Sequence, residues 1–219
     1  MADELPVSAH SGLSSAGERL ITELLRRGVG GAGPFLPARA VAEEALGATG
    51  GDVEAAVRRV VGSHVRLAAG SGLLTSLGGA ATILVTSPAG VTGVYLVCTR
   101  MTAAVALLRG HDLAAPVVRT AILLCLLGPD GAELAERTGI DRQSTSMLSG
   151  LRRLPDEVRD QLDRRIGYRL ASRFGRRGIL NVTKMIPVVA GPIGAGADAM
   201  AARTVATYAD VTFAQTRPR

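Results

Sequence analysis

The feature that most limits how this chain can fold is an uncharged stretch over residues 67–99. An apolar run of 18 or more residues ordinarily indicates a membrane-spanning helix. Six glycines and eight Ser or Thr residues interrupt this run, and Pro88 divides it into pieces of 21 and 11 residues. Small residues allow helix backbones to approach closely, so we expect two helices packed together about Pro88.

This predicted hairpin has two possible surroundings. It can be buried inside a soluble domain, or it can enter or touch a lipid bilayer. The hydroxyl groups oppose insertion into hydrocarbon, whereas the absence of charge favours it. Both alternatives remain open from the sequence.

Apolar residues recur at helical spacing along most of the 219 residues, which predicts an all-α fold. Only 3% of the residues are aromatic, but 47% are hydrophobic, and Ala, Val and Leu in such number can fill a core. We therefore expect one domain of tightly packed, Gly-rich helical hairpins over residues 13–214. Residues 1–12 and 215–219 are expected to be flexible ends.

The clearest amphipathic helix is predicted for residues 155–175, with Pro155 at its first position. Its apolar residues recur every four positions, and a stripe of arginines runs beside them. This stripe consists of Arg165, Arg169, Arg173, Arg176 and Arg177. An apolar ridge flanked by arginines suits the surface of an anionic membrane or a protein partner, but it also suits a core helix with a solvated edge.

The formal charge of +6 and the pI near 10.3 could also indicate nucleic-acid binding. Binding of single strands uses aromatic platforms, and the six aromatic residues of this chain form no cluster in the sequence. No zinc-finger spacing accompanies the basic residues. These observations argue against nucleic acid and favour an anionic membrane surface or a membrane protein as the partner.

A second uncharged, Gly-rich segment covers residues 185–197. It is too short to span a bilayer as one helix, and it predicts a tight helix-turn-helix about Gly191. Lys184, Asp198 and Arg203 are the charged residues near this turn. We expect them to form a polar cluster, either with an ion pair between Lys184 and Asp198 or with each side chain reaching water separately.

No catalytic, metal-binding or cofactor-binding motif is present in the sequence. The three histidines are 47 or more residues apart, and two separated cysteines cannot complete a zinc site. Cys98 and Cys125 lie in apolar runs, which favours buried thiols in a reducing compartment. The N-terminal residues are acidic, with no apolar stretch after them, so we expect a cytoplasmic protein.

Several short stretches, in this order and spacing, resemble the EcsC family of bacterial proteins in its actinobacterial form. They are His64-Val-Arg-Leu-Ala-Ala-Gly, Gly72-Leu-Leu-Thr-Ser-Leu-Gly-Gly, Tyr95 with Arg100-Met101, Leu108-Arg-Gly-His-Asp-Leu, Val118-Arg-Thr-Ala-Ile-Leu-Leu-Cys-Leu-Leu-Gly, Gly167-Tyr-Arg-Leu, Lys184-Met-Ile-Pro-Val-Val-Ala-Gly and Gly194-Ala-Gly-Ala-Asp-Ala-Met-Ala-Ala-Arg-Thr. Pro192 departs from the small or aliphatic residues that the family shows at this position, which puts a continuous helix there in doubt.

The resemblance implies a helical protein at the cytoplasmic face of the membrane, linked to a membrane transporter or to secretion. It brings no catalytic residues. We therefore expect a non-enzymatic, peripheral membrane or interaction module at the inner face of the cell membrane. The alternative is a soluble helical protein with an internal pocket for a hydrophobic ligand, or an enzyme site that the sequence does not reveal.

Overall fold

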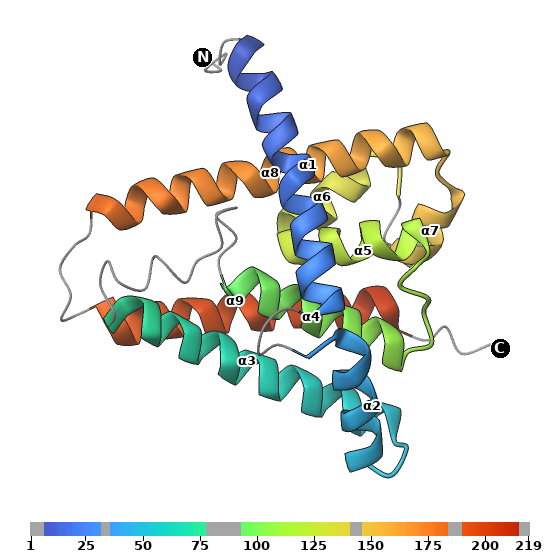
Figure 1. Cartoon of the computed structure of the whole chain (residues 1–219). Coiled ribbons are helices and arrows are strands. Elements are labelled where there is room, and N and C mark those ends of the chain that lie inside the picture. The colour runs from blue at the N-terminus through green and yellow to red at the C-terminus, as the bar shows by residue number, and fades with distance from the viewer. Residues whose placement is uncertain (1–6, 32–35, 78–92, 141–145, 184–189, 215–219) are drawn as a thin grey trace.

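A computed structural model describes residues 7–31, 36–77, 93–140, 146–183 and 190–214. Side chains are described for residues 15–31, 36–70, 93–140, 146–173 and 196–214. Within these residues the chain is a single all-α domain of nine packed helices without strands (Figure 1). The predicted fold class is confirmed. The helices are α1 (Val7–Gly30), α2 (Ala38–Ala48), α3 (Val53–Leu77), α4 (Gly93–Leu108), α5 (Pro116–Leu127), α6 (Pro129–Arg137), α7 (Met147–Arg153), α8 (Asp156–Thr183) and α9 (Ala190–Phe213).

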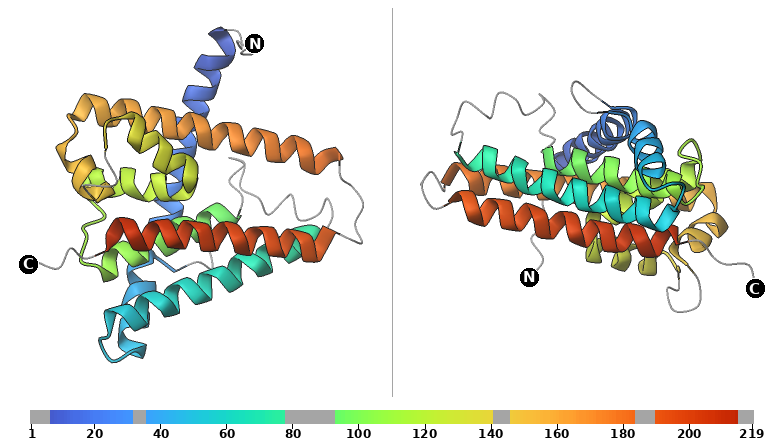
Figure 2. Two further views of the ribbon diagram at one scale, coloured as in Figure 1. Left: turned by 180° about the vertical axis from the view of Figure 1, so that it is seen from behind. Right: turned by 90° about the horizontal axis from the view of Figure 1, so that it is seen from below.

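Three helices, α3, α4 and α9, form the lower layer of the domain, and α3 and α9 lie antiparallel along most of their lengths (Figure 2). The α4 helix packs against both of them. Almost every residue of α4 from Val94 to Leu108 is buried, as are the residues of α5 from Thr120 to Leu127. These two helices form the centre of the core.

The upper layer contains α8, which α1 crosses before it reaches α4 (Figure 1). The crossing is close because glycines meet there: a Cβ atom added to Gly17 would lie 2.6 Å from the carbonyl carbon of Gly167. Leu162, Ile166 and Leu170 on α8 have no exposed surface. The predicted apolar stripe of this helix is therefore confirmed for these residues.

Local signals in the sequence account for several helix ends. Asp52 caps α3, since its Oδ1 accepts a hydrogen bond from the N–H of Ala55 at 3.0 Å. Pro116 and Pro129 stand in the first turns of α5 and α6, where a missing N–H costs nothing. Gly128 joins these helices with φ +60°, a conformation that glycine adopts without steric strain.

The predicted turn at Gly191 is wrong. The α9 helix begins at Ala190 and continues through Gly191, Pro192 and Gly194 to Phe213. Pro192 is the third residue of the helix, and an N–H in the first turn has no intrahelical acceptor, so the proline breaks no hydrogen bond. The residues 184–189 that precede the helix lie outside the described part of the chain.

The helices on either side of the first uncharged stretch, α3 and α4, do pack against each other, as the hairpin prediction required. Pro88 lies outside the described residues. Among the residues that the structure describes, no helix combines the length and the apolar composition needed to cross a membrane.

Candidate functional site

The predicted arginine stripe on α8 is divided between solvent and an internal contact. Arg165 is exposed. The Nη1 of Arg169 donates to the carbonyl oxygen of Asp130 at 3.1 Å, and the Nη2 of Arg173 donates to Oδ2 of Asp130 at 2.5 Å and to the carbonyl oxygen of Leu127 at 3.3 Å. Arg169 and Arg173 thus hold α8 against the start of α6.

The other two arginines of the stripe, Arg176 and Arg177, belong to α8, but their side chains lie outside the described part. Lys184 of the predicted polar cluster also lies outside it. Asp198 is half-buried on α9, and Arg203 is exposed on the same helix. The predicted ion pair between Lys184 and Asp198 therefore stays a prediction.

Three helix ends that are far apart in the sequence lie at one end of the molecule: the C-terminal ends of α3 and α8 and the N-terminal end of α9 (Figures 1 and 2). Their terminal segments are residues 67–77, 174–183 and 190–197. In the sequence these segments contain no Asp or Glu, and their charged residues are Arg176 and Arg177. We call these three segments the carboxylate-free end.

Two large apolar side chains are exposed next to this end. Leu67 on α3 is 41% exposed, and Met200 on α9 is 71% exposed. Arg109 contacts both Glu54 of α3 and Asp210 of α9, which places these two carboxylates at one level of the antiparallel pair. Leu67 is about 20 Å from Glu54 along the axis of α3, and Met200 is about 15 Å from Asp210 along the axis of α9. The two side chains therefore lie within about one helical turn of the same level.

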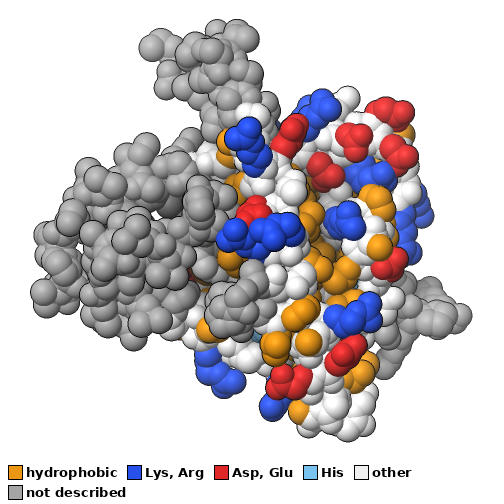
Figure 3. Space-filling model, in the orientation of Figure 1, with side chains coloured by type: hydrophobic (Ala, Val, Ile, Leu, Met, Phe, Trp, Pro, Cys, Tyr) orange, Lys and Arg blue, Asp and Glu red, His pale blue; other side chains and the backbone are white. Residues whose placement is uncertain are grey.

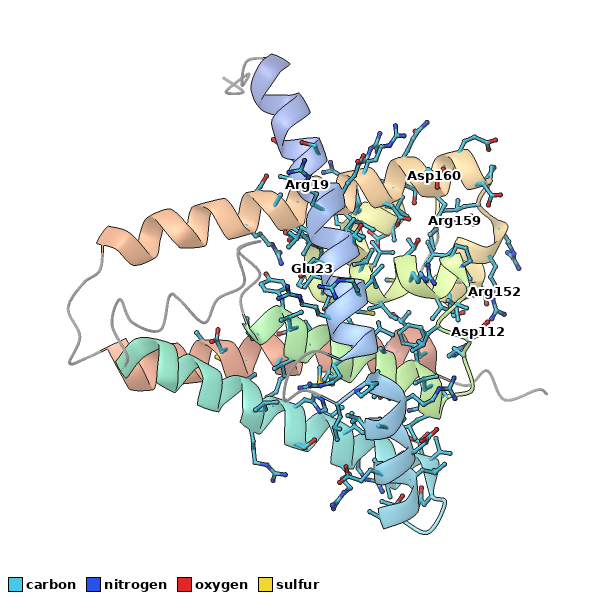
Figure 4. The ribbon with its side chains drawn as sticks, viewed as in Figure 1. Arg19, Glu23, Asp112, Arg152, Arg159 and Asp160 are labelled. Carbon is cyan, nitrogen blue, oxygen red and sulfur yellow. The ribbon has the colours of Figure 1, made fainter. Side chains whose placement is uncertain are left out.

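The remainder of the described surface is different in character. On the face shown in Figure 3, basic and acidic side chains alternate over α1, α2 and the first half of α8. Figure 4 shows Asp112, Arg152, Arg159 and Asp160 at the end of the molecule opposite to the carboxylate-free end. Charges of both signs thus occur together over the part of this face whose side chains the structure describes.

A half-open cavity of about 140 Å³ lies between α4, the turn from α5 to α6, α8 and α9. Its apolar lining includes Val94, Leu127 and Val205, and Arg173 supplies a cation. Asp198 and Arg203 of the predicted polar cluster do not line it. The cavity is smaller than the 300–1,000 Å³ that is typical of sites for drug-sized ligands.

A buried polar pair joins α3 to α4. The Nε of Arg100 donates to Nε2 of His64 at 3.2 Å, and Nδ1 of His64 lies 2.8 Å from the carbonyl oxygen of Val60. Because arginine can only donate, Nε2 must be the unprotonated nitrogen of the ring. Burial, together with the charge of Arg100, lowers the pKa of His64 to about 4, and burial also lowers the pKa of Arg100.

No arrangement suited to nucleophilic or metal catalysis appears in the described residues. They contain no group of three His, Cys, Asp or Glu side chains that could hold a metal ion. Burial raises the pKa of the Cys125 thiol to about 12, so this sulfur is not a nucleophile near neutral pH. Cys98 and Cys125 are both buried and free of disulfides, as predicted.

The sequence predicts no role for two polar contacts that the structure shows: the His64–Arg100 pair and the contact of Arg109 with Glu54 and Asp210. Arg100 is the only charged residue of α4, which is a signal for a buried cation with a partner on another helix. The partner itself could not be identified, because His64 is 36 positions away.

Comparison of the chain with protein-family models, with curated proteins and with solved structures finds no match.

Proposed function

We propose that this chain is a non-enzymatic, EcsC-like module. It binds peripherally to the anionic lipid surface at the inner face of the cell membrane. Its carboxylate-free end is the part that docks. The observation that carries the proposal is that three helix ends without Asp or Glu lie at one end of the molecule. Two of these ends are uncharged, and the third bears Arg176 and Arg177.

The chemistry of this end suits a lipid interface. Apolar residues can enter the boundary between headgroups and acyl chains, and arginines can remain among the phosphates. Each Lys or Arg near an anionic surface contributes about 1 kcal/mol to binding. Carboxylates would be repelled there; the three segments contain none, and Asp198, which follows the third segment on α9, is half-buried.

The arginines of α8 contribute unequally in this proposal. Arg169 and Arg173 both donate to Asp130 of α6, so their part in docking is to position the helix that carries Arg176 and Arg177. Arg165 is exposed nearer the middle of α8 and adds positive charge to the surface. Arg203 and Met200 on α9 are exposed next to the docking end and provide further cationic and apolar contacts.

Sedimentation with vesicles tests this proposal. We expect the chain to sediment with vesicles of phosphatidylglycerol and phosphatidylcholine at low salt but not with phosphatidylcholine alone. The double variant Arg176→Gln/Arg177→Gln should bind about thirty-fold more weakly, because two cations of about 1 kcal/mol each are removed. High salt should also release the protein, since it screens these charges.

The matched control is Arg152→Gln/Arg153→Gln, which removes an equal charge from two exposed arginines on α7. It should leave binding within about two-fold of that of the native chain, because the adjacent pair on α7 is remote from the proposed contact. Equal losses in the two double variants would show that only the net charge matters. Equal sedimentation with both kinds of vesicle would contradict an anionic-lipid function.

A further inference from the structure

We propose that the cavity beside Arg173 binds a small carboxylate with a compact apolar body of about the size of a benzene ring. This site is separate from the lipid contact proposed above. It is built from described residues of five helices, and it requires no membrane for its test.

The apolar body is inferred from the size and lining of the cavity. An enclosed cavity of about 150 Å³ with apolar walls accommodates one benzene molecule. The cavity here is half-open and measures about 140 Å³; Val94, Leu127 and Val205 form the aliphatic part of its wall, beside Tyr95 and Thr204. A ring or a short branched chain would therefore fill it, whereas a complete acyl chain would not.

The carboxylate is inferred from Arg173. One of its nitrogens, Nη2, is bonded to Asp130 and to the carbonyl oxygen of Leu127. Within the described part of the chain its hydrogen bonds all come from Nη2, which leaves Nε and Nη1 as donors; the side chain is 34% exposed, and Arg173 lines the cavity. A guanidinium with two donors available pairs well with a carboxylate, which can accept both.

Asp130 sets the strength of this site. Its carboxylate lies 2.5 Å from the guanidinium, so it partly neutralises Arg173 and competes with an incoming anion. Removing that charge should strengthen binding, whereas removing Arg173 should weaken it. Opposite effects of two substitutions in one ion pair are not expected from a general loss of structure.

The probe is benzoate, with benzamide as its neutral counterpart, added to the full chain without vesicles. Shifts of the methyl signals of Leu127 and Val205 in a carbon–proton NMR titration report occupancy. We expect a Kd on the order of 1 mM for benzoate. Benzamide should bind roughly ten-fold more weakly, because it lacks the charge-assisted hydrogen bonds.

Three variants divide the site into its parts. Arg173→Gln should remove the preference for benzoate over benzamide, and Asp130→Asn should tighten benzoate binding several-fold. Ala201→Leu fills the cavity and should abolish binding of both probes, while Ala197→Leu, at an exposed position of the same helix, should not. Circular dichroism of each variant checks that it is folded.

The proposal is overturned if benzoate causes no saturable methyl shifts at tenfold the expected Kd. It is equally overturned if Ala201→Leu binds benzoate as the native chain does, or if Asp130→Asn weakens binding. Should Arg173→Gln fail to fold, the Ala201 and Asp130 variants still decide. A negative result with benzoate would not change the result expected with vesicles. The ligand site and the lipid contact can therefore be refuted independently.

Discussion

At the scale of single residues, His64 is a neutral imidazole buried at the interface of α3 and α4. It is 5% exposed, and Arg100 beside it is 6% exposed. A proton on His64 would place two cations next to each other in the core and would remove the acceptor of the Arg100 hydrogen bond. The folded state therefore keeps the ring neutral.

We predict that this histidine makes stability depend on pH. Its pKa is about 4 in the folded state and 6.5 in the unfolded chain, so the unfolded state takes up the proton first as the pH falls. The free energy of unfolding should be unaffected by His64 above about pH 6.5 and should decrease by about 3 kcal/mol as the pH falls to about 4.

Urea unfolding at pH 7, 5 and 4 measures this effect against His64→Gln. A glutamine oxygen can still accept from Arg100, but it does not titrate. As the pH falls from 6.5 to 4, the free energy of unfolding of the native chain should decrease relative to that of the variant, because only the native chain has a titrating group at this position. A difference that is constant over this range would contradict the account.

At the scale of helices, α1 and α8 cross with their backbones in close contact at Gly17 and Gly167. A Cβ on Gly17 would lie 2.6 Å from a backbone carbon of α8, and a backbone cannot give way as a side chain does. We predict that Gly17→Ala separates the two helices and lowers the free energy of unfolding by about 1–3 kcal/mol.

The control for this substitution is Gly62→Ala in α3, where an added Cβ would have no atom within 4 Å. Alanine favours helix over glycine, so this variant should gain roughly 0.5–1 kcal/mol. Urea unfolding followed by circular dichroism measures both variants. A Gly17→Ala protein as stable as the native chain would show that the crossing is not tightly packed.

The sequence contains much of the information on these helices. Pro37, Asp52 and Pro155 indicate where α2, α3 and α8 begin, because capping and proline geometry act within a few residues. The prediction of a turn at Gly191 is wrong because proline and glycine are typical of turns but are also tolerated in the first turn of a helix, where they stand here.

Contacts between distant residues could not be predicted in this way. The stripe of arginines on α8 is visible in the sequence, but nothing local shows that Arg169 and Arg173 are held by Asp130, about 40 positions away. The cavity is likewise assembled from α4, α5, α6, α8 and α9. Such features depend on tertiary packing, which residue spacing on one helix does not specify.

At the scale of the whole molecule, the antiparallel pairing of α3 with α9 has the largest consequence for the proposed function. It brings the uncharged second half of α3 beside the uncharged start of α9, although more than 100 residues separate them in the sequence. The α8 helix ends on the same side with Arg176 and Arg177 (Figure 1). Apolar and cationic segments thus occupy one end, and mixed charges occupy the other.

The most direct test of this polarity is the fluorescence of a single tryptophan, because the native chain has none. Met200→Trp places the probe beside the carboxylate-free end, and Val211→Trp places it at an exposed position near the opposite end of α9. With anionic vesicles, we predict a blue shift and quenching by brominated lipid for Trp introduced at Met200 and neither effect for Trp at Val211. A response at Val211 alone, or at neither position, would contradict docking through this end.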